Sequence, residues 1–273
     1  MPSPVRSAVL ARSFAGKWAL VTGASAGIGE ALALDLAASG AHLVLTARRV
    51  ERLEALAARV RADYGVESRV VPADLALPEA PRQLYEATEG AGLPIDILIN
   101  NAGFGYLGKF EKGSLDWDRK MVDLNCAAVV HLTHLFLPRM IERKRGHIMI
   151  VASTASFQPV PYMATYAATK AFDRFLSEAL AAEVRPHGVN VSALCPGPTE
   201  SEFGQVAGVR KDFFRGSQTA ELVARKGLLA LVAGEPESLP AFSGAATVFF
   251  TRFLPRNAVT GLVEKIFRKS GAV

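Results

Sequence analysis

The sequence predicts a single doubly wound α/β domain, in which a parallel β-sheet carries helices on both faces. From residue 17 to about residue 101, short apolar runs alternate with longer amphipathic segments. This is the order of βαβ units, because parallel strands need a crossover connection that is usually a helix. No linker, internal repeat or low-complexity tract interrupts the 273 residues. The chain therefore reads as one large domain.

Each element follows from the spacing of the apolar residues. Short apolar runs predict strands at 18–22, 41–47, 68–73, 95–100, 146–153 and 190–195. Apolar residues at three- and four-residue spacing predict helices at 29–39, 50–64, 79–88, 117–141, 165–184 and 219–233. Residues 237–242 form at most an edge strand, since Pro240 has no N–H for a sheet ladder.

The chain divides into a domain and two extensions. Residues 1–14 form an N-terminal extension, and residues 15–243 form the domain, which includes a substrate loop at 198–220. Residues 244–273 form an amphipathic C-terminal extension. Within it, aromatic and apolar residues alternate with basic ones over 248–269. This pattern fits a helix packed on its own domain, a lid over an apolar substrate or a partner-binding helix. It also fits a helix lying on an anionic membrane surface.

Composition excludes several classes of protein. Half of the residues are hydrophobic and 21% are charged, and the net charge of +5 is scattered rather than gathered in a basic block. We therefore expect no nucleic-acid partner. Cys126 and Cys195 suggest neither a disulfide framework nor a metal site. There is no signal-peptide pattern, and no apolar run reaches the roughly 18 residues of a membrane span. A cytoplasmic protein without a transmembrane segment is expected.

The stretch "YAATK" places Tyr166 and Lys170 four residues apart in a predicted helix. Such residues share one face of the helix. A nearby ammonium favours the phenolate and lowers the pKa of a tyrosine. This pair predicts an acid/base site near neutral pH, and the alternative is a surface tyrosine that has a lysine beside it by chance.

The first predicted strand runs into "TGASAGIG", with glycines at 23, 27 and 29. A glycine turn between a strand and a helix lets the backbone approach a diphosphate at the helix N-terminus. Glycines also occur in tight turns that bind nothing. The position after the first strand favours a dinucleotide site.

Six motifs together resemble the short-chain dehydrogenase/reductase (SDR) family, over about residues 15–203. "TGASAGIG" resembles the family's cofactor turn, "NNAG" (100–103) its motif after the fourth strand, and "PGPT" (196–199) its loop over the nicotinamide. "DLN" places Asn125 at the family's asparagine, and Ser153 precedes Tyr166 by 13 residues, as the family's serine does. "YAATK" completes the set. The resemblance implies a Rossmann-type fold.

The resemblance also implies roles for four catalytic residues: Asn125, Ser153, Tyr166 and Lys170. Tyr166 would protonate the oxygen of a carbonyl that accepts hydride, and Ser153 would donate a second hydrogen bond to it. Thr154 and Ser156 compete with Ser153 for that role. Lys170 would lower the pKa of Tyr166 and hold the nicotinamide ribose. Asn125 would hold a water that relays protons.

Cofactor contacts are implied for the glycine turn, the ends of later strands and the catalytic pair. They are Gly23, Ser25, Gly27, Ile28, Gly29, Arg48, Asp74, Leu75, Asn100, Asn101, Gly103, Tyr166, Lys170, Pro196, Gly197 and Thr199. The second strand ends "LTARR" without an acid to take a ribose 2′-hydroxyl. Arginine binds phosphate through a planar fork. The sequence therefore favours NADP(H) over NAD(H), with Arg48 preferred to Arg49 as the 2′-phosphate ligand and Ser25 beside it.

We therefore expect an NADPH-dependent oxidoreductase that transfers hydride between the nicotinamide and an apolar carbonyl or secondary alcohol. Aromatic residues flank the expected cleft: Phe104, Phe157, Tyr162, Phe203, Phe213 and Phe214. A 3-oxoacyl-thioester reductase is an alternative, and a basic patch near the cleft would support it. A non-catalytic NADP(H)-binding sensor or scaffold is a second alternative, although it predicts a damaged catalytic set.

The sequence lacks the residue patterns that a serine hydrolase or a metal site requires. No histidine lies in a triad motif, so a serine hydrolase that uses Ser153 is disfavoured. His131 and His134 share a helix face without further ligands, and no metal site is expected. The apolar faces of the helices at 117–141 and 165–184 predict a homodimer or homotetramer. The Gly-rich ending of tetrameric family members is missing, which favours the dimer.

Overall fold

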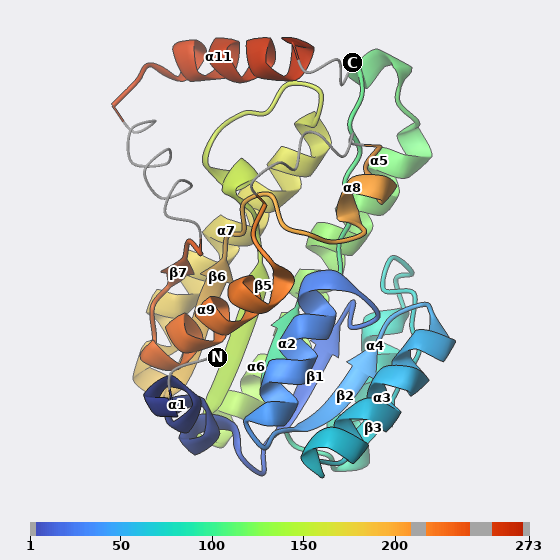
Figure 1. Cartoon of the computed structure of the whole chain (residues 1–273), viewed down its shortest axis with the longest axis vertical. Coiled ribbons are helices and arrows are strands. Elements are labelled where there is room, and N and C mark those ends of the chain that lie inside the picture. Colours follow the sequence, from blue (N-terminus) through green and yellow to red (C-terminus); the bar gives the residue numbers. More distant parts are fainter. Residues whose placement is uncertain (1–3, 209–216, 241–252, 270–273) are drawn as a thin grey trace.

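The computed structural model describes residues 4–208, 217–240 and 253–269 (Figure 1). Parts of the predicted loop at 198–220, the edge segment and the C-terminal extension lie outside the described residues, as do Phe213 and Phe214.

One parallel sheet of seven strands forms the centre of the molecule, in the order β3-β2-β1-β4-β5-β6-β7. The order reverses between β1 and β4, which is the topological switch point at which such sheets bind ligands. Among the strands of the described residues, the two-residue β7 pairs with β6 alone and so forms an edge of the sheet, two residues before Pro240. The strands are β1 Trp18–Thr22, β2 His42–Thr46, β3 Ser68–Val70, β4 Ile95–Asn100, β5 Gly146–Val151, β6 Val189–Leu194 and β7 Glu237–Ser238.

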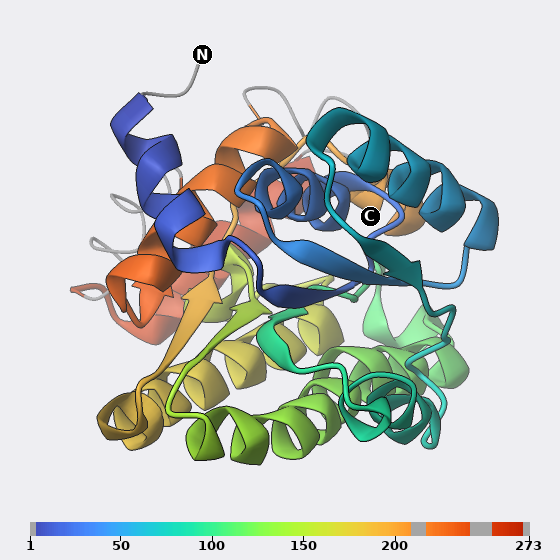
Figure 2. The same ribbon diagram turned by 90° about the horizontal axis from the view of Figure 1, so that it is seen from below.

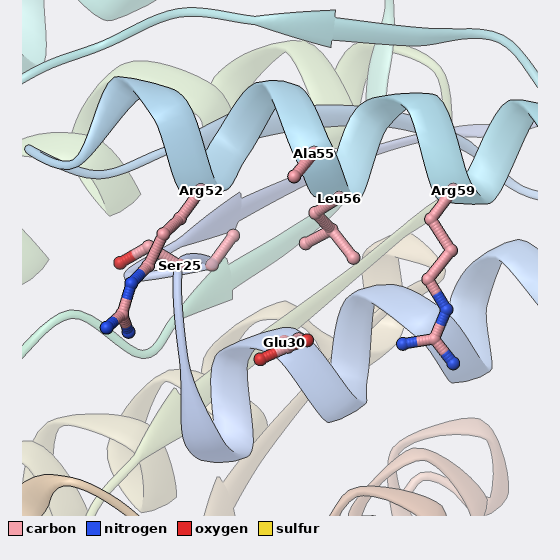
Figure 3. A pocket seen from close by; sticks show the side chains of 7 residues that line it. Ser25, Glu30, Arg52, Ala55, Leu56 and Arg59 are labelled. Atoms are coloured by element: carbon pink, nitrogen blue, oxygen red, sulfur yellow. The ribbon is translucent and has the colours of Figure 1, made fainter.

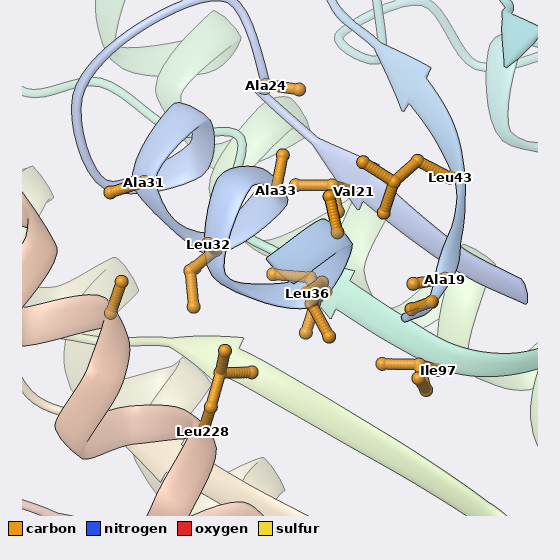
Figure 4. Close-up of a cluster of buried hydrophobic side chains, with 14 of the residues drawn as sticks. Ala19, Val21, Ala24, Ala31, Leu32, Ala33, Leu36, Leu43, Ile97 and Leu228 are labelled. Atoms are coloured by element: carbon orange, nitrogen blue, oxygen red, sulfur yellow. The ribbon is translucent and has the colours of Figure 1, made fainter. Parts of the chain in front are cut away.

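Helices cover both faces of the sheet, which confirms the doubly wound prediction (Figure 2). Successive strand residues point to opposite faces, so Val21 enters the core under α2, α3 and α9, and Leu20 enters the core under α4, α6 and α7. Figure 4 shows part of the first core. The described helices are α1 Pro4–Phe14, α2 Gly27–Ala38, α3 Val50–Tyr64, α4 Ala80–Glu86, α5 Leu115–Val122, α6 Ala128–Glu142, α7 Ala164–Val184, α8 Phe203–Val206, α9 Ala220–Ala233 and α11 Arg256–Lys269.

The N-terminal extension is a helix that packs into the domain. Leu10 and Phe14 of α1 are fully buried in the core that α1 shares with α2 and α9. The Phe14 ring meets His147 edge-on, with ring centroids 5.4 Å apart. Burial and the charge of Lys17 lower the pKa of His147 to about 4, so this imidazole is neutral at physiological pH.

The predicted helix at 117–141 is interrupted by a π-helical segment, Asp123–Ala127, that joins α5 to α6. Such segments widen one turn of a helix and occur often at functional sites. The segment carries Asn125, and the apolar periodicity of residues 117–141 does not indicate the interruption.

Among the described residues, the combined helix Leu115–Glu142 is long and apolar enough to cross a membrane. Helices in the core of globular domains share that property. Leu132, Phe136 and Met140 are buried against the sheet. We therefore interpret this helix as part of the core.

The helix α11 lies across the end of the molecule that also carries α5 and α8 (Figure 1). Val263 and Phe267 pack into the apolar cluster around Tyr166. Tyr162 donates a hydrogen bond to Glu264 Oε1, with an O···O distance of 2.8 Å. Of the alternatives for the C-terminal extension, residues 256–269 show packing on the chain's own domain, as a cover beside Tyr166. Contact with a membrane surface stays a prediction.

Candidate active site

The structure brings the four predicted catalytic residues together at the carboxyl ends of β4 and β5. Ser153 follows β5, and Tyr166 and Lys170 lie one turn apart on α7. The Ser153 hydroxyl lies close enough to Tyr166 to favour its phenolate. Gly103 follows β4, and a methyl group added to it would lie 3.0 Å from Asn125 Oδ1 and 3.5 Å from Lys170 Nζ. These distances place Asn125 beside the other three residues.

Tyr166 is a buried phenol in this structure. Burial raises its pKa, because the interior solvates a phenolate poorly. The Lys170 ammonium and the Ser153 hydroxyl favour the phenolate, as the sequence predicted, but they do not outweigh burial. The net shift is therefore opposite to the one expected from Lys170 alone. Tyr166 is protonated at neutral pH, which suits the donor in a carbonyl reduction.

Lys170 is held by two acceptors. Its Nζ donates to Val151 O at 2.8 Å and to Asp173 Oδ2 at 2.9 Å, and both side chains of the ion pair are buried. Burial disfavours the ammonium, but the charges of Asp173 and Tyr166 raise the pKa of Lys170 above its usual value. Two of the three ammonium protons are engaged in this way. The sequence analysis missed Asp173, since a single acid on a long helix gives no signal of its own.

We expect Asp173→Asn to move the alkaline limit of the reductase reaction to lower pH. The Asp173 carboxylate raises the pKa of Tyr166, so its removal lowers that pKa. Reduction needs the protonated phenol, and activity is lost as pH rises through the pKa of Tyr166. The measurement is kcat/KM against pH. Ser177→Ala, at a buried uncharged position on α7, is the control and should leave the profile unchanged. An unchanged or higher alkaline limit in Asp173→Asn would contradict this role.

Asn125 is fully buried, and its amide is used for positioning. Its Oδ1 accepts from Phe104 N at 3.2 Å, and its Nδ2 donates to Phe104 O and Thr169 Oγ1, each at 3.0 Å. These bonds join the loop after β4 to α7 and so fix this helix against the sheet. The water relay that the resemblance implies stays a prediction.

The glycine turn packs directly on Asn101. A methyl group at Gly29 would lie 2.3 Å from Gly23 O and 2.4 Å from Asn101 Nδ2. The Asn101 amide donates to Thr22 O at 2.8 Å and to Gly23 O at 3.3 Å. Thr22 Oγ1 accepts from Asn101 N at 2.9 Å. The glycine at 29 is therefore required by close packing within the turn, whether or not a ligand is present.

The residues around this turn fit a dinucleotide. Gly23 and Gly27 have positive φ angles of 64° and 60°, and α2 begins at Gly27 without a side-chain cap on Ala26. The first backbone N–H groups of α2, next to Ile28, are therefore available to an anion such as a diphosphate.

Arg49, rather than Arg48, lies against Ser25. Arg49 Nε and Nη2 donate to Ser25 Oγ at 3.2 and 3.0 Å. Arg48 is exposed at the end of β2. The backbone at Arg49 is extended, with φ −90° and ψ 90°, and neighbouring side chains in extended chain point in opposite directions. The 2′-phosphate role predicted for Arg48 stays a prediction, and Arg52 and Glu202, which the sequence analysis did not name, complete the cluster around Arg49.

The remaining predicted contacts lie along the carboxyl edge of the sheet. Asp74 follows β3 and accepts from Ala76 N through Oδ1 at 3.2 Å, next to the buried Leu75. Two hydrogen bonds shape the loop after β6, one to the segment after β5 and one within the loop. Thr154 N donates to Pro196 O at 2.8 Å, and Thr199 Oγ1 donates to Gly197 O at 2.9 Å. Their roles toward a cofactor stay predictions.

An apolar cluster surrounds Tyr166. The Tyr166 and Phe203 rings lie 5.2 Å apart between centroids. A cavity of about 30 Å³ lies next to Tyr166, between Tyr106 and Tyr162. Members of the cluster come from the β4–α5 and β5–α7 loops, α5, α7, α8 and α11: Phe104, Tyr106, Leu107, Met121, Ala155, Val160, Tyr162, Met163, Tyr166, Ala167, Phe203, Val263 and Phe267.

Comparison with known proteins gives consistent results. The family model for short chain dehydrogenases matches residues 17–210. The chain is 37% identical to very-long-chain 3-oxoacyl-CoA reductase-B of Danio rerio over 187 residues, which covers 66% of this chain and 59% of that protein. It is 32% identical to a very-long-chain 3-oxoacyl-CoA reductase of Anas platyrhynchos over 257 residues, which covers 92% of this chain and 80% of that protein.

A solved structure extends the likeness to the fold. The short-chain dehydrogenase from Sphingobium yanoikuyae, in complex with NADPH, superposes with a TM-score of 0.80. It is 32% identical to this chain, and the match covers 91% of this chain and 95% of that one. With the parallel sheet, the glycine turn and the serine, tyrosine and lysine cluster in place, the chain belongs to the short-chain dehydrogenase family of oxidoreductases.

Proposed function

We propose that this protein is an NADPH-dependent reductase of an apolar carbonyl substrate, and that 3-oxoacyl thioesters are the substrate class. The observation that carries the proposal is the position of the buried Tyr166 phenol. Ser153 and Lys170 interact with this phenol, and Tyr166 belongs to an apolar cluster that includes Val263 and Phe267 of α11. The two curated relatives described above are named 3-oxoacyl-CoA reductases, which favours the thioester class over other carbonyls.

The chain's own residues supply binding, orientation and a proton. When bound, NADPH would supply the hydride. The Ser153 hydroxyl and the Tyr166 phenol would donate hydrogen bonds to the substrate carbonyl oxygen, where negative charge develops as hydride arrives. Tyr166 would then transfer its proton to that oxygen. The Lys170 ammonium, held by Asp173 and Val151 O, would stabilise the resulting phenolate.

The surroundings of the cluster suit a long apolar chain with a charged carrier. Val263 and Phe267 of α11 bring apolar surface to the Tyr166 side of the site. Lys109 and Lys112 are exposed on the loop that lines the small cavity, with Glu111 between them. Exposed lysines there would attract the phosphates of a coenzyme A carrier. These two lysines favour the thioester alternative, while Glu111 and Asp118, which lines the same cavity, reduce the local positive charge.

The substrate class can be tested with a series of 3-oxoacyl-CoA thioesters of increasing acyl length and with bulky ketones that lack a carrier. We expect kcat/KM with NADPH to rise with acyl length, because each buried methylene contributes about 0.8 kcal/mol. Bulky ketones should be poorer substrates. Equal or better turnover of the ketones would reject the thioester class and leave a general carbonyl reductase. Val263→Ala, which trims the α11 cover, should weaken the dependence on acyl length.

Cofactor choice belongs to the same proposal. The Arg49, Arg52 and Ser25 cluster has donors for a ribose 2′-phosphate. We therefore propose a preference for NADPH over NADH of about tenfold or more, equivalent to about 1.4 kcal/mol. Titration of protein fluorescence with each nucleotide measures it directly.

We propose that the protein is a homodimer. Phe172 and Phe175 of α7 and Val122 of α5 are exposed apolar residues on neighbouring helices, and the Phe175 side chain is 64% exposed. Two copies of this face would form an isologous contact. Light scattering should give about twice the 29.1 kDa of one chain, and Phe175→Asp should give the monomer. Leu77→Asp, at a residue of similar exposure away from these helices, is the control. A monomeric wild-type protein at micromolar concentration would remove the proposal. A cytoplasmic location stays a prediction.

A further inference from the structure

The segment after β6 reaches the start of α3 through one acidic side chain. Glu202 accepts from Arg49 Nη1 and Arg52 Nη1, each at 2.6 Å, through its two carboxylate oxygens. The two arginines lie at the start of α3, some 150 residues away along the chain. Arg49 also donates to Ser25 of the glycine turn. A single carboxylate therefore gathers both arginines beside the turn.

This carboxylate occupies the donors that a phosphate monoester would use. Arginine forks bind carboxylate and phosphate in the same way. Ser25 and Arg52 lie at one end of a pocket of about 300 Å³ between α2 and α3, with Glu30 and Arg59 farther along it (Figure 3). In this fold, the residues at the end of the second strand face the ribose 2′ position of a dinucleotide.

We propose that Glu202 is an internal competitor for the 2′-phosphate of NADP(H), and that it thereby limits how strongly the protein prefers NADP(H) to NAD(H). The inference rests on the proposed cofactor site. The phosphate must displace the carboxylate from Arg49 and Arg52 in order to bind. A 2′-hydroxyl has no charge to compete with, so NAD(H) leaves both ion pairs in place.

The contact is weak enough to be displaced. The Glu202 side chain is 40% exposed, and the two arginine side chains are more exposed still. Exposed ion pairs contribute little each, because water and salt screen them. The two arginines lower the pKa of Glu202, so the carboxylate is ionised at neutral pH. A phosphate that carries more charge than a carboxylate can therefore replace it.

The same contact ties the segment after β6 to the glycine turn. A methyl group at Gly27 would lie 3.0 Å from Ser201 Cβ, so residues next to Glu202 rest against the turn itself. Displacement of Glu202 by a 2′-phosphate would release this segment from α3.

The test compares Glu202→Gln with wild type in calorimetric titrations with NADPH, NADH and adenosine 2′,5′-bisphosphate. We expect Glu202→Gln to bind NADPH and the bisphosphate about three- to tenfold more tightly, in keeping with the loss of two exposed ion pairs, and to bind NADH unchanged. Glu200→Gln is the matched control. Glu200 is exposed on the same segment, and its backbone N–H bonds to Gln218 O. In a protein that already carries Arg49→Gln, the increase in NADPH affinity caused by Glu202→Gln should be smaller.

The outcomes separate the two proposals. If wild type binds NADPH and Glu202→Gln binds it equally or more weakly, then Glu202 is not a competitor, while the cofactor site stands. An equal gain in affinity for NADPH and NADH would also overturn the inference. The substitution would then act on the part that the two nucleotides share. Failure of wild type and variant to bind either nucleotide would overturn the cofactor site itself, and this inference with it.

Discussion

Replacing Tyr166 by Phe is expected to lower kcat/KM for carbonyl reduction by about a thousandfold, within the range that general acids contribute. The substitution removes the hydroxyl that donates to the substrate oxygen and keeps the ring, which packs against Phe203. The fold and the glycine turn are not touched. The affinity for NADPH should therefore stay close to that of wild type, and the loss should appear in turnover. The measurement is the steady-state rate of NADPH oxidation together with a fluorescence titration of NADPH.

Tyr162→Phe is the matched control for this prediction. Tyr162 lies in the same apolar cluster as Tyr166. Its hydroxyl donates a hydrogen bond to Glu264 of α11. We expect its loss to change kcat/KM by much less than the loss of the Tyr166 hydroxyl. Comparable losses in the two variants, or a Tyr166→Phe variant that keeps most of its activity, would contradict the assignment of Tyr166 as the proton donor.

Replacing Gly29 by Ala is expected to destabilise the protein and to disrupt the glycine turn. The new methyl group would lie 2.3 Å from Gly23 O, a backbone atom that cannot move away without shifting the turn. Overpacking of this kind costs about 1–3 kcal/mol. For a chain of this size, each kcal/mol lowers Tm by about 2–4 °C. The shifted turn should also bind NADPH less well. Thermal unfolding and NADPH titration measure the two effects.

Gly261→Ala provides the control, since it makes the same change in another helix. A methyl group at Gly261 of α11 meets no atom within 4 Å. There the higher helix propensity of Ala should stabilise the helix by about 0.5–1 kcal/mol. We expect Gly29→Ala to lower the stability of the protein and Gly261→Ala to raise it. A Gly29→Ala variant as stable as wild type would show that the turn tolerates a side chain.

The fold was predictable because parallel strands buried on both faces have a simple sequence pattern. The runs "WALVT" and "IDILIN" give β1 and β4 with the bounds expected from the sequence. The ends of strands that depend on tertiary packing were not predictable. The short β3 stops at Val70, three residues before the end of its apolar run.

The grouping of Ser153, Tyr166 and Lys170 was predictable because these residues sit at fixed spacings after one strand and on one helix. Residues whose contacts depend on burial or on partners far away in the sequence were not predictable. Asp173 meets Lys170 within one turn of α7, but only the burial of that face makes the contact matter. Glu202 meets Arg49 over a separation of 153 residues. Nothing in the local sequence of either residue distinguishes it from an exposed surface charge.

The direction of the Tyr166 pKa shift is another feature that could not be predicted from the sequence. The spacing of Tyr166 and Lys170 correctly indicated that the ammonium favours the phenolate. The depth at which the phenol is buried, and the Asp173 carboxylate that opposes Lys170, depend on the complete packing around α7. Electrostatic shifts of this kind are sums over the whole surroundings, so a pair of residues cannot determine them.

The central claim is that Tyr166 and its neighbours serve hydride transfer from a nicotinamide to a carbonyl carbon. The most direct measurement uses NADPH deuterated at the transferred position of the nicotinamide ring, with a long-chain 3-oxoacyl-CoA as the acceptor, and analyses the product by mass spectrometry. We expect one deuterium on the new carbinol carbon of the 3-hydroxyacyl product with wild type, and no product with Tyr166→Phe above its residual rate. Tight binding of NADPH without deuterium transfer to the thioester or to any ketone tested would contradict the account.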